Sequence, residues 1–384
     1  MAARVPGLDV RAARDLPQVV QALQPPSREE GGPAAELPRA HAAAATGAAG
    51  GPARGDGSSQ PDEPGPAGSL PDLRDVCGQA GARRALEIAA AGGHALLLVG
   101  PPGTGKSMLA QRLAGILPPL PAEEALESAA LHGLARSGAE LLPPGCRPVR
   151  APHHTASAVA LVGGGSPPMP GEVSLAHGGV LFLDELPEFP RAALEALREP
   201  LETGRVTLSR AGRQAHYPAR FQFVAAMNPC PCGWLGAFAA TGKTCRCTAE
   251  AVARYQGRVS GPLLDRIDLL VEVPAQRAEL LLAPSAAESS AEVAARVAAA
   301  RQRMAARQGV PNGALDAASL AASVALEPQA RSFAQRTAEG LGWSGRALHR
   351  VLKVARTVAD LAGEDTVQLA HVAEAAQWRR ALVG

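Results

Sequence analysis

The hydrophobic pattern contains four short apolar segments bounded by glycine or polar residues, namely HALLLVG (94–100), GGVLFLDE (178–185), FQFVAAMN (221–228) and IDLLVEV (267–273). Continuous apolar runs of this length are typical of strands that are covered on both faces. Stretches with helical spacing lie between them, beginning with 75–93, where Ala85, Ile88 and Ala89 share one face. Strands that alternate with helices predict an α/β domain with a parallel central sheet, over residues 71–275.

The pattern changes after Pro274. Helical periodicity without a convincing strand runs from Ser289 to Gly309, and again from about Ser344 to the end. The clearest apolar stripe in this region comprises Leu348, Val351, Leu352, Ala355, Val358 and Ala362. Residues 276–384 are therefore predicted to form a helical domain.

The first part of the chain has a different composition. Residues 1–24 can form one strand and a short helix, which is too little to bury a core. Residues 25–70 are rich in Pro, Gly, Ala, Ser and charged residues and have almost no large apolar side chains. They cannot offset the entropy lost on ordering, so we expect a disordered linker.

Composition bounds the classes of function. The chain has 384 residues, of which 46% are hydrophobic, enough for two domains with their own cores. A formal net charge of +2 means that any basic surface must be local, and 3% aromatic residues argue against a platform of rings that stacks bases. Because no apolar run is long enough for a membrane span or a secretory signal, we expect a cytoplasmic protein without disulfides.

The segment GPPGTGKS fits the phosphate-binding pattern G-x-x-x-x-G-K-[ST], with an apolar strand before it and a helical pattern after it. Glycines allow backbone N–H groups to turn toward phosphates, and the helix N-terminus adds partial positive charge. The predicted nucleotide-binding residues are Gly100, Pro101, Pro102, Gly103, Thr104, Gly105, Lys106 and Ser107. Lys106 is expected to reach the β- and γ-phosphates of ATP, and Ser107 to bind Mg²⁺.

Two acids, Asp184 and Glu185, end the second apolar segment. Strand-end acids beside a phosphate loop lie at the crevice where the carboxyl ends of parallel strands meet. Asp184 is predicted to hold Mg²⁺, and Glu185 to polarise the attacking water as the general base. Asn228 ends the third segment, where its amide can orient that water. An asparagine that only begins a turn before Pro229 is the alternative.

Two arginines are candidates for contact with the reacting phosphate. Arg266 lies between Asp265 and Asp268, so it either pairs with those acids or, in a ring of subunits, reaches the γ-phosphate of a neighbour. Arg346 follows Ser344, a predicted N-cap, and a cation there opposes the helix dipole unless an anion is close. Arg346 is therefore either a phosphate-binding residue or an ordinary surface arginine.

Six cysteines occur in the chain, and four of them form two CxC pairs. The paired residues are Cys230, Cys232, Cys245 and Cys247. Four thiolates can close a tetrahedral Zn²⁺ site, although CxxC is the usual spacing and reduced thiols in a polar loop are the alternative. His153 and His154 are adjacent and point in different directions, so a structural or channel-facing role is favoured over joint metal binding.

Residues 204–221 alternate like a β-hairpin and carry Arg205, Arg210, Arg213 and Arg220 without a single acid. A ribbon of this charge attracts a phosphate backbone without reading sequence. It predicts salt-sensitive, sequence-tolerant DNA binding. A solvated cationic ribbon without a ligand is the alternative.

Together these motifs resemble the YifB/ComM family of magnesium-chelatase-like AAA+ ATPases, from about Pro71 to the end. The resemblance is carried by LLLVGPPGTGKSMLAQRLAGILPPL, RAPHHTASAVALVGGG, GEVSLAHGGVLFLDELPEF, AAMNPCPCG, CRCT and SGPLLDRIDL. It implies a P-loop AAA+ core with a C-terminal helical lid, and a homo-oligomeric ring, expected to be a hexamer, with ATP at subunit interfaces. It also implies a sensor-1 role for Asn228, an arginine-finger role for Arg266 and a sensor-2 role for Arg346, through which hydrolysis would move the lid.

Members of this family usually carry an N-terminal Lon-protease-like domain of the ribosomal-S5 kind. Residues 1–24 resemble only its last strand and helix, so the resemblance implies a truncated chain. ComM-like members act as DNA branch-migration helicases in natural transformation, which predicts an ATP-driven ring motor that acts on DNA through the arginine hairpin. The alternatives are a magnesium-chelatase-like ATPase that remodels a protein partner, and an inactive truncated fragment.

Overall fold

The structure is a computed structural model that describes residues 71–135, 145–210, 213–276 and 287–379. The strand and helix predicted within 1–24, and the linker predicted over 25–70, lie outside the described residues. Within the described residues, the α/β class predicted from the apolar pattern is confirmed.

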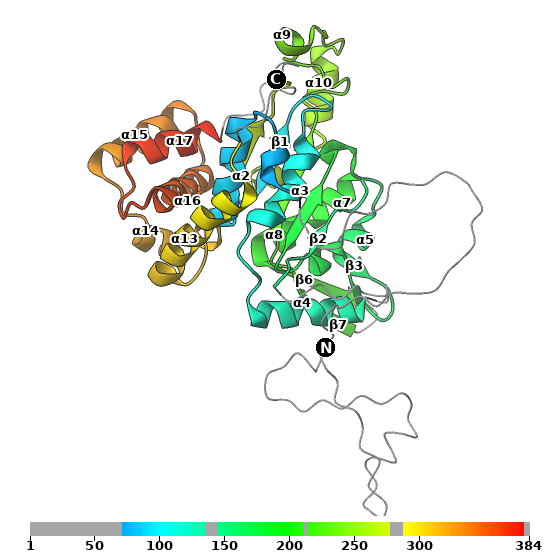
Figure 1. Cartoon of the computed structure of the whole chain (residues 1–384). Helices are drawn as coiled ribbons and strands as arrows, with labels where there is room; N and C mark the ends of the chain where they lie inside the picture. Colours follow the sequence, from blue (N-terminus) through cyan, green and yellow to red (C-terminus); the bar gives the residue numbers. More distant parts are fainter. Residues whose placement is uncertain (1–70, 136–144, 211–212, 277–286, 380–384) are drawn as a thin grey trace, which may run out of the picture. The chain divides into compact units, whose positions relative to one another are not determined.

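Within the described residues, five parallel strands form the central sheet in the order β2–β5–β8–β1–β9. Two of them, β1 and β2, are labelled in Figure 1. They are β1 (Leu96–Val99), β2 (Val149–Arg150), β5 (Val180–Leu183), β8 (Gln222–Met227) and β9 (Leu269–Glu272). The four longer strands are the predicted apolar segments. The sequence did not predict β2, because its two residues, one of them charged, form no apolar run.

The helices of the core are α2 (Ala80–Gly92), α3 (Lys106–Ile116), α4 (Ala122–Leu134), α5 (Ala158–Val162), α6 (Glu172–Leu175), α7 (Arg191–Ala196), α8 (Arg198–Thr203), α9 (Phe238–Thr241), α10 (Ala249–Gln256) and α11 (Gly261–Leu264). Successive strand residues point to opposite faces of the sheet. Leu96 therefore packs in the cluster that contains α2 and α3, and Leu97 packs in the cluster that contains α7. Helix α2 begins at Ala80 instead of near residue 75, because Gly78 and Gln79 have left-handed φ angles of 64° and 50°.

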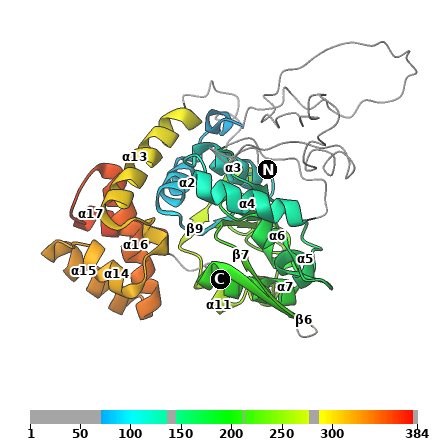
Figure 2. The same ribbon diagram turned by 90° about the horizontal axis from the view of Figure 1, so that it is seen from below.

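In the part of the chain that the structure describes, two antiparallel hairpins interrupt the alternation of strands and helices. Strands β6 (Arg205–Arg210) and β7 (Arg213–Pro218) confirm the predicted hairpin (Figure 2). Strands β3 (Gly163–Gly164) and β4 (Met169–Pro170) form a smaller one. The Tyr217 hydroxyl in β7 donates to the backbone carbonyl of Pro168 at 2.8 Å, so the two hairpins are joined.

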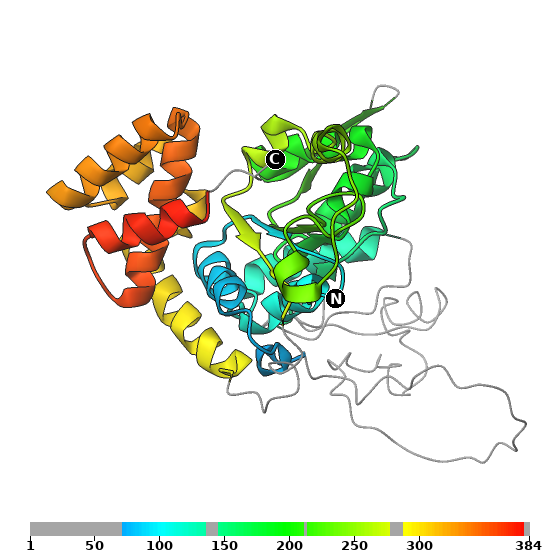
Figure 3. The ribbon, with the colours of Figure 1, turned by 90° about the horizontal axis from the view of Figure 1, so that it is seen from above.

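The C-terminal region is helical, as predicted (Figure 3). Its helices are α13 (Ser290–Gln308), α14 (Ala317–Ser323), α15 (Pro328–Gly340), α16 (Gly345–Ala362) and α17 (Leu369–Gln377). Five of the six residues of the predicted apolar stripe in α16 are buried or half-buried. The sixth, Ala362, is exposed because it is the last residue of the helix before the Gly363 cap.

A buried polar network holds α16 against the sheet. The carboxylate of Asp268 accepts hydrogen bonds from Arg350 at 2.5 Å and from the backbone N–H of Ala95 at 3.0 Å. Burial raises the pKa of Asp268, but nearby His94 and the charge of Arg350 outweigh this and hold the pKa well below its ordinary range. His94 Nε2 also lies 2.8 Å from Thr357 Oγ1. These contacts fix α16 beside the amino end of β9.

Candidate functional site

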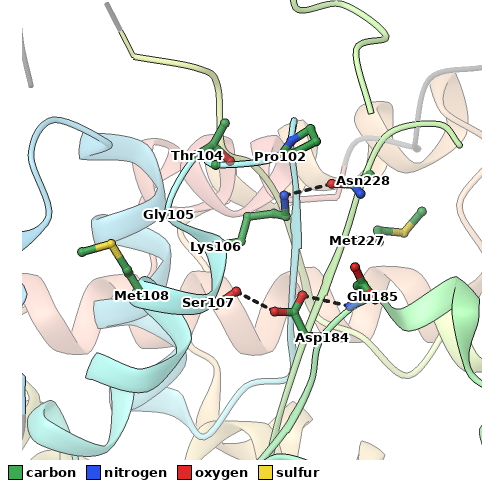
Figure 4. A pocket seen from close by; sticks show the side chains of 11 residues that line it. Pro102, Thr104, Gly105, Lys106, Ser107, Met108, Asp184, Glu185, Met227 and Asn228 are labelled. Atoms are coloured by element: carbon green, nitrogen blue, oxygen red, sulfur yellow. Dashed lines mark hydrogen bonds between the residues drawn. The ribbon is translucent and has the colours of Figure 1, made fainter. Parts of the chain in front are cut away.

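The predicted phosphate loop borders a cavity of about 380 Å³ at the carboxyl ends of β1, β5 and β8 (Figure 4). The cavity is lined by Pro102, Gly103, Thr104, Gly105, Lys106, Ser107, Met108, Asp184, Glu185, Met227 and Asn228. Ligand sites of open α/β sheets lie at this edge. The structure therefore brings together the loop, the two acids and the asparagine that the sequence selected. Gly100 and Pro101 form the start of the loop.

Two different constraints require glycine in this loop. At Gly100 a Cβ atom would lie 2.2 Å from the carbonyl oxygen of Val273, so the chain after β9 leaves no room for a side chain. Gly103 and Gly105 have φ angles of 76° and 88°, which glycine adopts readily. Helix α3 begins at Lys106 without a side-chain cap, so the backbone N–H groups of its first turn are available to bind an anion.

Lys106 is buried, with its ammonium group turned onto the loop. Its Nζ atom donates to the carbonyls of Gly100 and Pro101 at 2.7 and 2.8 Å, and to Asn228 Oδ1 at 3.1 Å. Burial lowers the pKa of Lys106, and the negative charges of Asp184 and its neighbouring acid oppose this. The ammonium thus lies where it can exchange these partners for phosphate oxygens.

Ser107 and Asp184 meet beside the loop. Ser107 Oγ donates to Asp184 Oδ2 at 2.5 Å, and the backbone N–H of Glu185 donates to the other carboxylate oxygen at 2.9 Å (Figure 4). Mg²⁺ prefers hard oxygen ligands and usually combines one or two protein groups with substrate phosphates. A hydroxyl and a carboxylate held this close at the foot of a phosphate loop fit that ion.

Glu185 has a φ angle of 52°, unusual for a residue other than glycine. A left-handed backbone of this kind costs of order 1–3 kcal/mol and is concentrated at functional sites. The Glu185 side chain is 54% exposed, and His154 Nδ1 lies 3.1 Å from its Oε2 atom. His153 instead bonds Thr155 Oγ1 at 2.9 Å. The structure therefore places His154 beside the acid that we predicted as the base, a position that the sequence did not indicate.

Gln79 is a site residue that the sequence motifs missed. Its side chain is only 6% exposed, and its amide donates to the carbonyls of Thr104 and Pro274 at 3.2 and 2.7 Å. It thereby ties the phosphate loop to the segment after β9. The only signal in the sequence is a Gly-Gln pair ahead of a helix, which is too common to single out.

Arg266 and Arg346 do not line the cavity. Arg266 precedes β9 and so lies at the amino-end edge of the sheet, and a strand of this length separates the two edges by about 13 Å. Both guanidinium groups contact the carboxylate of Glu202 in α8, Arg266 at Oε2 and Arg346 at Oε1, the latter at 3.4 Å. Arg266 also donates to the carbonyl of Pro262 at 2.7 Å.

Of the two alternatives for Arg266, the pairing with Asp265 or Asp268 does not occur among the described residues. Asp268 accepts from Arg350, and Asp265 pairs with Arg379. The Arg266 guanidinium instead donates to the carbonyl of Pro262 in α11, four residues earlier, and contacts Glu202.

Four cysteine side chains converge in the loop between β8 and α10, with all four sulfur atoms within 4.8 Å of one another. They are Cys230, Cys232, Cys245 and Cys247. Three of the sulfur–sulfur distances are 3.4, 3.7 and 3.6 Å. Zn–S bonds of about 2.3 Å give a tetrahedron with edges of about 3.8 Å, so the donor set fits Zn²⁺. Hydrogen bonds from the backbone N–H groups of Trp234 and Arg246 lower the pKa of Cys232 to about 6, whereas burial and the neighbouring cysteine sulfurs raise the pKa values of Cys245 and Cys247.

The hairpin arginines have different surroundings. Arg205 begins β6, and Arg210 pairs with Arg213 in the backbone register beside the turn. Arg220 follows the hairpin, and its guanidinium lies 3.1 Å from Glu127 of α4 while its side chain is 63% exposed. Arg220 therefore has an acidic partner from a distant segment, which the acid-free hairpin sequence did not indicate.

The parallel sheet, the phosphate loop and the acids at the strand ends define a P-loop protein of the α/β class. The family described as "Magnesium chelatase, subunit ChlI" matches residues 72–281, and the one described as "Magnesium chelatase, subunit ChlI C-terminal" matches residues 287–379. The chain therefore belongs to the magnesium chelatase ChlI family.

Similarity to individual proteins agrees with this assignment. The chain is 51% identical to the uncharacterized protein YifB of Salmonella typhimurium, and 48% identical to YifB of Escherichia coli and to the competence protein ComM of Haemophilus influenzae. Each match covers 80% of this chain and 60% of the relative, so the chain spans about 60% of the length of the curated relatives it matches. The resemblance to the YifB/ComM family is thus confirmed. Every helix in the described part of the chain is too short or too polar to span a bilayer.

Proposed function

We propose that this protein binds and hydrolyses ATP and works as a ring-forming motor on DNA. The observation that carries the proposal is the convergence of Lys106, Ser107, Asp184 and Glu185 on one cavity. These side chains supply a phosphate-binding cation, two magnesium ligands and a general base, which are the parts that P-loop NTPases use. Similarity to a protein named for competence supports DNA as the molecule on which the motor acts.

Each of these residues has a defined task. Lys106 and the N-terminus of α3 bind the β- and γ-phosphates of ATP. Ser107 and Asp184 hold Mg²⁺, which neutralises phosphate charge when it is bound. Glu185 accepts a proton from the water that attacks the γ-phosphate, and Asn228, beside Lys106, orients that water.

The positions of Arg266 and Arg346 support a ring. Both lie away from the phosphate loop of their own chain, so they serve the nucleotide of another subunit. In a head-to-tail ring, the surface of one subunit that carries Arg266 and Arg346 can lie against the phosphate loop of the next subunit. We infer a homo-oligomeric ring, expected to be a hexamer. For Arg346, the predicted sensor-2 residue, we propose contact with the nucleotide across the interface.

DNA binding is tested with Arg210→Ala/Arg213→Ala, at the turn of the hairpin. Wild-type ATP hydrolysis should rise when single-stranded or forked DNA is added, and the variant should bind DNA more weakly. Each phosphate contact on single-stranded DNA contributes about 0.7 to the slope of log affinity against log salt, so the slope should become shallower by about 1.4. Fluorescence anisotropy over a salt series measures both quantities.

The matched control is Arg331→Ala/Arg336→Ala, which removes the same charge from exposed positions in α15. It should leave the affinity and the salt slope unchanged. Equal slopes for wild type and the hairpin variant would exclude the hairpin as the contact. Stimulation by a protein partner but not by DNA would favour a chelatase-like remodelling ATPase, and no hydrolysis by the assembled protein would favour an inactive fragment.

The cysteine loop borders the nucleotide cavity. A Cβ atom on Gly233, between the two cysteine pairs, would lie 2.6 Å from Pro102 of the phosphate loop. Gln256 of α10 donates to the carbonyl of Pro229 at 2.9 Å and holds the start of the loop. A metal ion in this loop would therefore stiffen one wall of the nucleotide site.

We further propose that the four cysteines bind Zn²⁺, and metal analysis of purified protein should find about one zinc per chain. Cys245→Ser/Cys247→Ser should lose nearly all of it, because two remaining thiolates cannot close a tetrahedral site. Cys77→Ser/Cys146→Ser is the control, since those cysteines lie outside the cluster, and it should keep its zinc. Wild-type protein that contains no zinc after purification and incubation with excess Zn²⁺ would refute the site.

A further inference from the structure

One carboxylate contacts both arginines that we assign to the neighbouring nucleotide. Glu202, near the end of α8, faces Arg266 through Oε2 and Arg346 through Oε1. Among the described residues, no other acid forms an ion pair with either arginine. The three side chains come from three separate segments of the chain, so their meeting depends on the tertiary fold.

The two arginines are held to different degrees. Arg266 is 9% exposed, and its Nη1 atom is fixed on the carbonyl of Pro262. The Arg346 side chain is 53% exposed and comes from the first turn of α16 in the C-terminal region. One turn further along α16, Arg350 binds Asp268, which anchors that part of the helix to the sheet. Glu202 is therefore the link between an arginine of the core and an arginine of the helical region.

Electrostatics explains why the link is needed. Two guanidinium groups that approach the same phosphate repel each other, and a carboxylate between them offsets that repulsion. The hydrogen bond from Arg266, together with the charges of Arg266 and Arg346, lowers the pKa of Glu202, so its carboxylate is ionised at neutral pH. The three charges sum to +1, which still attracts an anion.

We propose that Glu202 is a positioning residue that gathers Arg266 and Arg346 into one two-arginine site for the triphosphate of the neighbouring subunit. This inference rests on the proposed function, because it requires ATP at the interface between subunits. Glu202 does not touch the nucleotide. It sets the distance and direction of the two guanidinium groups that do.

The test is Glu202→Gln, which keeps the size of the side chain and removes its charge. In assays without DNA, kcat for ATP hydrolysis should fall about tenfold and KM for ATP should stay within about twofold, because these arginines act mainly on the transition state. Glu199→Gln is the matched control. It removes the same charge from an exposed position in the same helix, and within the described residues Glu199 forms no ion pair with either arginine. Its kcat should equal that of wild type.

Two further measurements separate positioning from a general loss of structure. Glu202→Asp keeps the charge on a shorter side chain, and its kcat should fall between those of wild type and Glu202→Gln. Glu202→Gln subunits mixed with Lys106→Ala subunits should recover activity, because the second kind supplies an intact Glu202 to the nucleotide sites of the first. If Glu202→Gln instead damaged the nucleotide site of its own subunit, mixing would not restore ATP hydrolysis.

The outcomes distinguish this inference from the function on which it rests. A wild-type protein that does not hydrolyse ATP refutes the proposed function. An active wild type with an equally active Glu202→Gln refutes only the role of Glu202. A raised kcat, or a raised KM with unchanged kcat, also refutes it, because the first indicates a restraining contact and the second a contribution to substrate binding.

Discussion

Replacement of Glu185 by glutamine should abolish ATP hydrolysis and leave ATP binding intact. The amide keeps the size of the side chain but cannot accept a proton from water at neutral pH. A general base contributes roughly 10²–10⁴-fold to a rate, and kcat should fall by about that factor. Lys106 and Ser107 are unchanged, so the Kd for ATP should stay within about threefold. Phosphate release measures the first quantity, and titration with a fluorescent ATP analogue measures the second.

Glu188→Gln provides a control for this substitution. Glu188 lies three residues further along, is exposed, pairs with Arg258 at 2.8 Å and does not line the cavity. Its kcat should be that of wild type. If Glu185→Gln hydrolysed ATP at the wild-type rate, another group would have to be the base, and His154, 3.1 Å from the carboxylate, would be the first to examine.

The parts of the fold that the sequence predicted are those with a local cause. A strand that is buried on both faces is mostly apolar, so β1, β5 and β8 appear as nearly continuous runs. The edge strand β9 is apolar over Leu269–Val271 and ends in the exposed Glu272. The carboxyl ends of parallel strands share one edge, which is why the phosphate loop, Asp184 and Glu185 could be expected to meet. The alternation of 204–221 likewise predicted the β6–β7 hairpin. Each of these inferences needs only neighbouring residues and one rule of sheet geometry.

The parts that the sequence missed depend on packing between distant segments. Glu202 of α8 contacts Arg266, which precedes β9, and Arg346 of α16 through the tertiary fold, and nothing in the spacing of these residues indicates it. The same holds for Arg220, whose acidic partner, Glu127, lies in α4. His154 reaches the acid after β5 because it follows β2, the short strand that the apolar pattern could not predict and that pairs with β5.

Arg266→Ala should lower ATP hydrolysis about 10³-fold or more, because an arginine that stabilises the transition state of phosphoryl transfer contributes about 10³–10⁵. Lys106→Ala should be equally inactive for a different reason, the loss of the cation that binds the phosphates. The Arg266→Ala variant keeps its phosphate loop intact, and the Lys106→Ala variant keeps both Arg266 and Arg346. Each should retain the folded state of wild type, which a thermal melt checks.

If Arg266 acts on the neighbouring subunit, the two inactive variants should complement each other when they are mixed and assembled with ATP. A site is complete wherever an Arg266→Ala subunit supplies the phosphate loop and a Lys106→Ala subunit supplies the arginine, which in equal random mixtures is about a quarter of all sites. The mixture should therefore hydrolyse ATP far faster than either variant alone. An arginine that served its own nucleotide would give no recovery at any ratio, since each chain would then carry its own defect. Recovery thus requires that the two halves of one site come from two chains, as we propose from the separation of Arg266 from its own phosphate loop.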